Sequence, residues 1–195
     1  MKILYIVTIG GTMVFFENLI KELILEGHII DIATNETEEE VPSYTEQFNT
    51  RPWMKSAEIT DKLIAAIESG NYEFLRVNYP GGDMVGHFGE LEPTIIAMES
   101  IDVCLKRIID AVNERGGVTI ITADHGNAEE LIDEKGNPKT SHTTNKIPFI
   151  LVGDTKNIRF KKGEFGLANV AATVADLLGV APADNWEESM LEAEK

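Results

Sequence analysis

The sequence of 195 residues predicts an α/β fold with three layers, α/β/α, in which helices cover both faces of a mainly parallel sheet. Runs rich in β-branched residues alternate along the chain with segments whose apolar residues recur at helical spacing. Glycines and glycine pairs mark several of the changes between these two kinds of segment. A chain of this length has room for one well-buried core, so we expect one compact domain.

The opening of the chain predicts a strand, a helix and a second strand. The first strand covers residues 3–7 and is closed by Gly10-Gly11, the helix spans Phe16–Ile24, and the second strand covers residues 28–33. The glycine pair lacks the full spacing of a phosphate-binding G-x-G-x-x-G motif, so we interpret it as a tight turn. Residues 35–51 are polar and acidic and predict an exposed connector.

The remainder of the chain continues the alternation. Apolar spacing predicts a helix over residues 55–69, a strand over residues 74–79 and a long amphipathic helix from near Pro93 to Gly116-Gly117. Cys104, the single cysteine, lies beside the apolar stripe of that helix and is expected in the core. The last predicted elements are a strand at 118–122, an apolar run at 147–152 and a helix at 167–178. Pro148 within the run suits an edge strand or the start of a strand.

The charge and composition of the sequence exclude several classes of binding partner and cellular location. The sequence holds 33 acidic and 17 basic residues, a net charge of −16, which argues against nucleic acid and anionic membranes as partners. The apolar run at residues 3–9 is too short to span a membrane, and no signal-peptide cleavage site follows it. One cysteine fits a reducing compartment, so we expect a cytoplasmic protein.

Metal-ligand residue types gather in three short stretches at strand ends. They are Asp83-Met-Val-Gly-His87, Asp124-His125 and Ser141-His142-Thr-Thr-Asn145, and they hold three of the four histidines. Mixed nitrogen and oxygen donors suit Mn²⁺ or Zn²⁺. Each histidine alone is more often a hydrogen-bonded imidazole, and Asp124 could instead cap the start of a helix. The three stretches together favour a metal site.

The spacing of Asp83 and His87 allows two local structures. Residues four apart face the same way on a helix, so one helical turn would present both to one ion. The neighbouring glycines, Gly81-Gly82 and Gly86, favour a close-fitting loop in which the backbone approaches the ion. We expect the loop, although either structure presents two ligands.

These motifs resemble the cofactor-independent phosphoglycerate mutases of the alkaline phosphatase superfamily, over about residues 41–191. The resemblance rests on five segments: Asn78–His87, Ile121–Glu129, Thr140–Phe149, Arg51–Lys62 and Trp186–Met190. It implies an alkaline phosphatase-like fold and an isomerase of glycolysis that moves a phosphoryl group between the 2- and 3-positions of glycerate through a phosphoserine. Its substrate would be a phosphorylated small molecule.

The resemblance also implies a site with two metal ions, usually Mn²⁺, with Mg²⁺, Co²⁺ or Zn²⁺ as alternatives. Asp83, His87 and His142 would hold one ion, and Asp124 and His125 would contribute to the other. In the family, the second ion has two further ligands, an aspartate and the nucleophilic serine, from an N-terminal segment. Neither motif is present in this sequence, so we expect no catalytic nucleophile.

Other parts of the chain depart from the family pattern. Tyr44-Thr45 follows Pro42-Ser43 where many relatives carry a phosphate-facing lysine, and Phe88 stands where a small polar residue often follows the histidine. The large inserted domain that holds the glycerate phosphate is also missing. Residues 1–36 instead resemble the start of a GT-B glycosyltransferase, in Lys2–Thr12 and Glu26–Asn35. We therefore expect an unrelated opening over 1–36 and a mutase-like domain over 37–195.

Three functions remain open. The first is a truncated mutase-like enzyme for phosphoryl transfer. The second is a catalytically inactive metal-binding fragment or pseudoenzyme, whose unpaired sheet edge would favour self-association or a complementing partner chain. The third is a metal-dependent phosphatase or phosphodiesterase that activates water and needs no serine.

Overall fold

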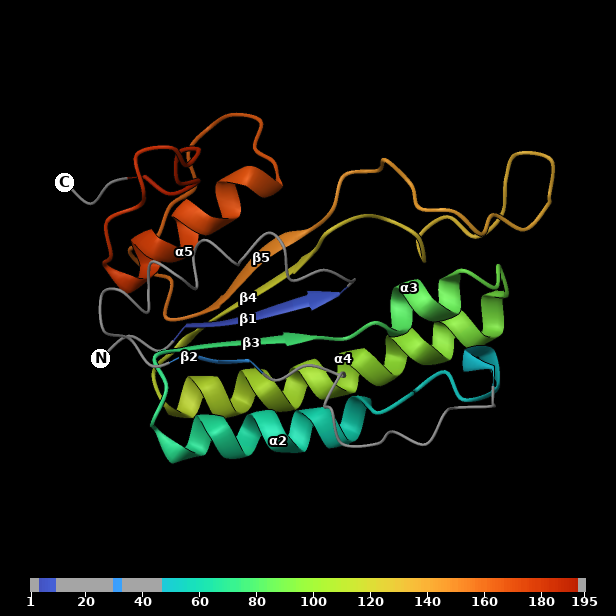
Figure 1. Cartoon of the computed structure of the whole chain (residues 1–195), viewed down its shortest axis with the longest axis horizontal. Helices are drawn as coiled ribbons and strands as arrows, with labels where there is room; N and C mark the ends of the chain where they lie inside the picture. The colour runs from blue at the N-terminus through green and yellow to red at the C-terminus, as the bar shows by residue number, and fades with distance from the viewer. Residues whose placement is uncertain (1–3, 10–29, 33–46, 193–195) are drawn as a thin grey trace.

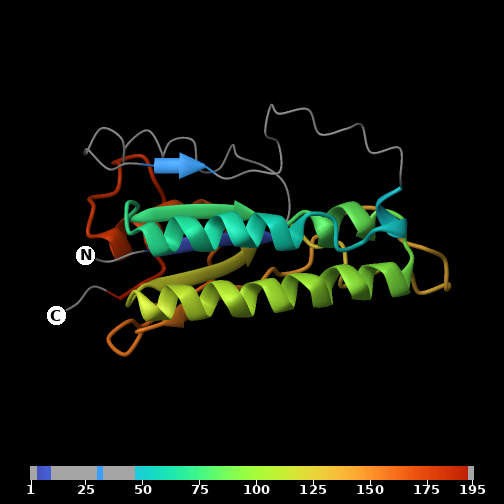
Figure 2. The same ribbon diagram turned by 90° about the horizontal axis from the view of Figure 1, so that it is seen from below.

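A computed structural model describes residues 4–9, 30–32 and 47–192 of the chain. The described elements form three layers, a central sheet with helices on both of its faces (Figure 1), and a view turned by 90° shows the same arrangement from below (Figure 2). The expected α/β/α fold is therefore confirmed. The predicted helix at 16–24, the glycine turn before it and most of the acidic connector lie outside the described residues.

The sheet has five strands in the order β2-β3-β1-β4-β5. The first four are mutually parallel where they pair, and β5 runs antiparallel to β4 at the edge, as expected for a strand that follows Pro148. The earliest strand of the chain thus lies at the centre of the sheet, between β3 and β4. The bounds are β1 Leu4–Ile9, β2 Ile30–Ile32, β3 Phe74–Asn78, β4 Val118–Ala123 and β5 Phe149–Gly153.

Two long helices cover one face of the sheet and a shorter helix covers the other (Figure 1). α2 and α4 lie side by side, and α5 packs on the opposite face, preceded by a 3-10 turn at Leu167–Asn169. A further 3-10 turn, Phe48–Thr50, precedes α2. The bounds are α2 Ser56–Ser69, α3 Gly81–Gly86, α4 Leu91–Glu114 and α5 Val170–Leu178.

The core has two halves, one on each face of the sheet. Alternate residues of β3 serve both: Phe74 packs with α5, whereas Leu75 and Val77 pack with α2 and α4. Cys104 is 5 % exposed and belongs to the α2 and α4 half, as expected. Within the described residues, no helix combines the length and the apolarity needed to cross a bilayer.

The segment that carries Asp83 and His87 is a short helix, α3, so the expectation of a loop is wrong. Two of its glycines face different neighbours. A Cβ atom on Gly81 would make ordinary contacts with α4, at 3.4 Å from Cδ1 of Ile101 and 3.5 Å from Cβ of Ala97. A Cβ atom on Gly86 would instead overlap the side chain of Asn127, so of the two only Gly86 needs to lack a side chain.

Gly86→Ala is expected to destabilise the chain by about 1–3 kcal/mol, because overpacking a filled site forces its neighbours to shift. The added methyl would overlap the side-chain amide of Asn127. The free energy of unfolding can be measured by urea denaturation. Gly163→Ala is the matched control, since its nearest neighbour atom would be 3.4 Å away. Equal stability of the two variants would contradict this account of α3.

Candidate metal centre

Five side chains singled out from the sequence come from three segments at one edge of the sheet. α3 follows β3 directly, and Asp124 and His125 follow β4. Because β3, β1 and β4 are parallel, their carboxyl ends lie at the same edge, where α/β proteins place their ligands. His142 comes from the loop before β5, which is tied to the end of β4 by the bridge between Gly126 and Thr143.

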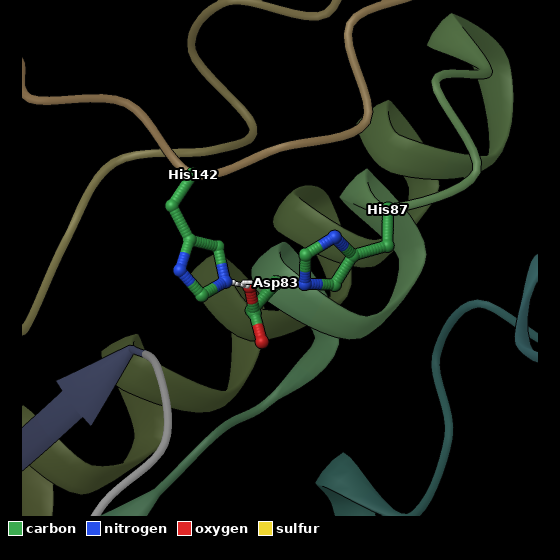
Figure 3. A group of neighbouring side chains, drawn as sticks. All are labelled: Asp83, His87 and His142. Atoms are coloured by element: carbon green, nitrogen blue, oxygen red, sulfur yellow. Dashed lines mark hydrogen bonds and ion pairs between the residues drawn. The ribbon is translucent and has the colours of Figure 1, made fainter.

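Asp83, His87 and His142 form a compact triangle of donor atoms (Figure 3). Oδ1 of Asp83 lies 3.2 Å from Nε2 of His87 and 3.0 Å from Nε2 of His142. The two Nε2 atoms are 3.1 Å apart. Three donors bound at about 2.0–2.2 Å to one ion are separated by about 2.8–3.1 Å in octahedral geometry and about 3.3–3.6 Å in tetrahedral geometry, so the triangle fits a divalent ion.

The ring orientation of His87 favours metal binding. Its Nδ1 lies 2.7 Å from the carbonyl oxygen of Thr140, and a carbonyl can only accept, so Nδ1 carries the proton. In the neutral ring, Nε2 then presents its lone pair to the other two donors. A backbone partner on the distal nitrogen is the usual way in which a ligating histidine is oriented.

Asp124 and His125 lie beside the triangle. Nε2 of His125 is 3.5 Å from Oδ1 of Asp124 and 4.0 Å from Oδ1 of Asp83, and its ring stacks on that of His142 with centroids 3.7 Å apart. Oδ1 of Asp124 is buried and accepts no hydrogen bond. A buried carboxylate oxygen of this kind is an apt ligand for a cation. No helix follows Asp124, so the helix-cap alternative is wrong.

A buried arginine contributes positive charge near this carboxylate. Arg76, on β3, is 5 % exposed. Burial lowers the pKa of its guanidinium, and the negative charge of Asp124 opposes that shift. The guanidinium thereby offsets part of the negative potential that Asp83 and Asp124 create at this edge of the sheet.

Behind the ligands lies a hydrogen-bonded group that the sequence analysis missed, although its members belong to the quoted motifs. Oε2 of Glu129 accepts from the backbone N–H of Asn127 at 2.7 Å, and Oε1 accepts from the hydroxyl of Thr143 and from Nδ2 of Asn145, the latter at 3.0 Å. Nδ2 of Asn127 in turn donates to Oδ1 of Asp83 at 3.2 Å. We call Glu129, Asn127 and Thr143 the loop clamp.

The hydrogen bonds of the loop clamp lower the pKa of Glu129. Burial alone would raise the pKa of this carboxyl, but the hydrogen bonds from Thr143, Asn145 and nearby backbone N–H groups together hold the pKa below its ordinary value. A depressed carboxyl pKa means that the ionised form stabilises the fold at neutral pH. That contribution is lost as the pH falls through the depressed pKa.

Comparisons with known proteins agree with this architecture. A family model described as the metalloenzyme superfamily matches residues 18–182. The 2,3-bisphosphoglycerate-independent phosphoglycerate mutase of Trypanosoma brucei brucei is 43 % identical over 169 residues, covering 78 % of this chain and 31 % of the relative. The protein of that name from Hahella chejuensis is 45 % identical over 145 residues, covering 74 % and 28 %. The chain thus spans about 30 % of the length of these relatives.

Solved structures give the same result. Phosphoglycerate mutase from Leishmania mexicana, crystallised at low cobalt concentration, superposes with a TM-score of 0.74 at 36 % identity, covering 99 % of this chain and 38 % of that one. The PH0037 protein from Pyrococcus horikoshii shares the fold, with a TM-score of 0.50 at 19 % identity over 92 % of this chain and 50 % of that one. The resemblance to the phosphoglycerate mutases is confirmed, and the chain belongs to the metalloenzyme superfamily.

Proposed function

We propose that the chain provides the metal-binding part of a phosphoglycerate mutase-type site for phosphoryl transfer, with Mn²⁺ as its ion. Asp83, His87 and His142 would hold the first ion, and Asp124 and His125 would contribute to a second. The observation that carries the proposal is the triangle of donor atoms, with separations of 3.0, 3.1 and 3.2 Å, at the carboxyl edge of the sheet. The names of the relatives supply the substrate class.

The charge of the chain explains why such a site would need a cation. At a net charge of −16, the protein repels an anionic phosphoglycerate. A divalent ion would supply the local positive charge that draws a phosphoryl group to this edge and stabilises its transfer. The protein's part is to hold the ligands in place: the carbonyl of Thr140 orients His87, and Asn127 fixes the carboxylate of Asp83.

A second candidate function is metal binding without turnover by this chain alone. Ser141 and Thr143, on either side of His142, are the two hydroxyl residues that could replace a serine nucleophile. The environment of Thr143 argues against that role for it. Thr143 is 8 % exposed, and its hydroxyl donates to Glu129. A hydroxyl committed to a carboxylate and shielded from solvent is poorly placed to attack a substrate. Turnover would then depend on a complementing chain that brings a nucleophile to the edge of the sheet.

Titration of the chain with Mn²⁺, followed by electron paramagnetic resonance, tests the site, and coupled mutase and phosphatase assays test the reaction. We expect His142→Ala to weaken Mn²⁺ binding by at least about tenfold, since it removes one corner of the triangle. Lys146→Ala is the control: that side chain is 94 % exposed and pairs with Glu164, and it is not one of the proposed ligands. It should bind Mn²⁺ like the unaltered chain.

The outcomes separate the candidates. Turnover of phosphoglycerate that disappears in His142→Ala supports the enzyme. Stoichiometric Mn²⁺ binding with no turnover supports the chain that needs a partner. Hydrolysis of a phosphate ester without mutase activity would support a metal-dependent phosphatase. Unchanged Mn²⁺ affinity in His142→Ala would overturn the metal site itself.

A further inference from the structure

The five proposed metal-ligand side chains can face one another only if two loops lie in a fixed position beside α3. The loop after β4 carries Asp124 and His125, and the loop before β5 carries His142. Farther from the sheet, the two loops pair through a bridge between Ile132 and Pro138, and the N–H of Lys139 donates to the carbonyl of Leu131 at 2.7 Å. Beside the metal-ligand side chains they share one bridge, in which the backbone N–H of Thr143 donates to the carbonyl of Gly126 at 2.8 Å. Few backbone hydrogen bonds therefore fix the two loops next to the ligands themselves.

Glu129 adds a constraint next to the ligands, because its carboxylate accepts hydrogen bonds from both loops at once. One oxygen accepts from the backbone N–H of Asn127 at 2.7 Å, and the other accepts from the hydroxyl of Thr143, the residue after His142. A carboxylate that accepts several hydrogen bonds forms stronger ones than a neutral acceptor would. Glu129 thus holds the first loop at Asn127, two residues after His125, and the second loop at Thr143, next to His142.

The clamp also reaches the third segment, α3. The backbone of Asn127 is held by Glu129, and its side chain, in a residue only 4 % exposed, donates to Oδ1 of Asp83 at 3.2 Å. Gly126 permits this arrangement, since a Cβ atom there would overlap both the Thr143 hydroxyl and the Glu129 carboxylate. Through one carboxylate, all three ligand-bearing segments are connected.

We propose that Glu129 is the positioning residue of the metal centre, which sets the geometry of the ligands without touching the ion. The inference rests on the proposed metal site. Groups that orient metal ligands from behind contribute about 10–100-fold to metal affinity. Glu129→Ala is therefore expected to weaken Mn²⁺ binding of the full chain by about 10–100-fold, although all five proposed ligands are still present.

Glu129→Gln tests whether the charge of this two-sided contact matters. Its amide oxygen can still accept from the N–H of Asn127 and its Nε2 can donate to the Thr143 hydroxyl, but it lacks the negative charge and that nitrogen cannot accept from Nδ2 of Asn145; we expect an intermediate loss of affinity. Glu130→Gln is the matched control. The carboxylate of Glu130 accepts from Asn145 at 3.1 Å and pairs with Lys139 at 2.7 Å. Glu130 contacts the loop clamp through its backbone N–H, which donates to the carbonyl of Asn127 at 3.1 Å and is kept in the variant. It should leave Mn²⁺ affinity within about twofold of the unaltered chain, well below the effect of losing an orienting group.

The measurement is Mn²⁺ titration of each variant by electron paramagnetic resonance, with the visible spectrum of the Co²⁺-loaded chain as a report on ligand geometry. A weakened affinity with an altered Co²⁺ spectrum in both Glu129 variants, graded from Gln to Ala, supports positioning. Circular dichroism shows whether each variant is folded. If Glu129→Ala is unfolded, the Mn²⁺ affinity of Glu129→Gln alone tests the positioning role. Unchanged Mn²⁺ affinity in Glu129→Gln and Glu129→Ala, together with a loss in His142→Ala, would overturn the role of Glu129 and leave the metal site intact. Unchanged affinity in His142→Ala would instead refute the site.

Discussion

Asp83→Asn is expected to weaken Mn²⁺ binding by at least about a hundredfold, the upper end of what the loss of a supporting group costs. Asp83 is the hub of the centre: its Oδ1 lies within 3.2 Å of His87 Nε2, His142 Nε2 and Asn127 Nδ2. Asparagine keeps the shape of the side chain but removes the negative charge that hard cations require. Electron paramagnetic resonance of free Mn²⁺ measures the loss directly.

Asp110→Asn provides the control for the loss of one carboxylate. Asp110 lies on α4 and pairs with Lys106 at the surface, where it is 54 % exposed. Removing its charge changes the net charge by the same amount and should leave Mn²⁺ affinity nearly unchanged. If Asp83→Asn and Asp110→Asn bound Mn²⁺ equally well, the ion would have to be held elsewhere.

Ile108→Ala is expected to cost about 2–5 kcal/mol of the free energy of unfolding, because the cavity it leaves cannot collapse in a filled core. Ile108 is fully buried on α4, in the same half of the core as Leu63 and Ile67 of α2. A domain of this kind is stable by only about 5–15 kcal/mol, so the loss is a large fraction of the total. Urea denaturation followed by circular dichroism gives the shift in midpoint.

Val103→Ala on the same helix is the matched control. Val103 is 63 % exposed, and removing its methyl groups should change the free energy of unfolding by no more than about 0.5 kcal/mol. A large loss in both variants would indicate that the outer face of α4 is covered in solution. A small loss in Ile108→Ala would contradict the packing of α2 against α4.

The sequence predicts the helices and strands that carry strong periodicity. The expected helix at 55–69 is α2 within one residue, and the long helix expected from near Pro93 begins two residues earlier, at Leu91. For α3 the prediction fails, because the six residues from Gly81 to Gly86 are too few to show helical periodicity and three of them are glycines. Packing against α4, which the sequence does not display, makes that segment helical.

Part of the candidate site can likewise be predicted from the sequence, and part of it cannot. Residue type and position at strand ends are visible in the sequence, so the sequence singles out the five proposed ligands, and the structure places them at one edge of the sheet. The loop clamp is not visible in this way, because Glu129 is one carboxylate among 33 acidic residues. Glu129 can bond to both loops only because the fold brings Gly126 and Thr143 side by side. The one signal in the sequence is that Glu129 lies four residues after His125, within the segment Ile121–Glu129.

The central place of β1 has a consequence for how the chain folds. β1 pairs Leu4 with Phe74 on one side and with Val118 on the other, so both of its ladders join residues far apart in sequence. Closing loops of this length costs entropy before any contact compensates for it, and proteins dominated by such contacts fold slowly. During synthesis, β1 has both edges unpaired until β3 has been made, and one edge unpaired until β4 has been made. An unpaired strand edge can pair with another chain, so this stage of synthesis is exposed to aggregation.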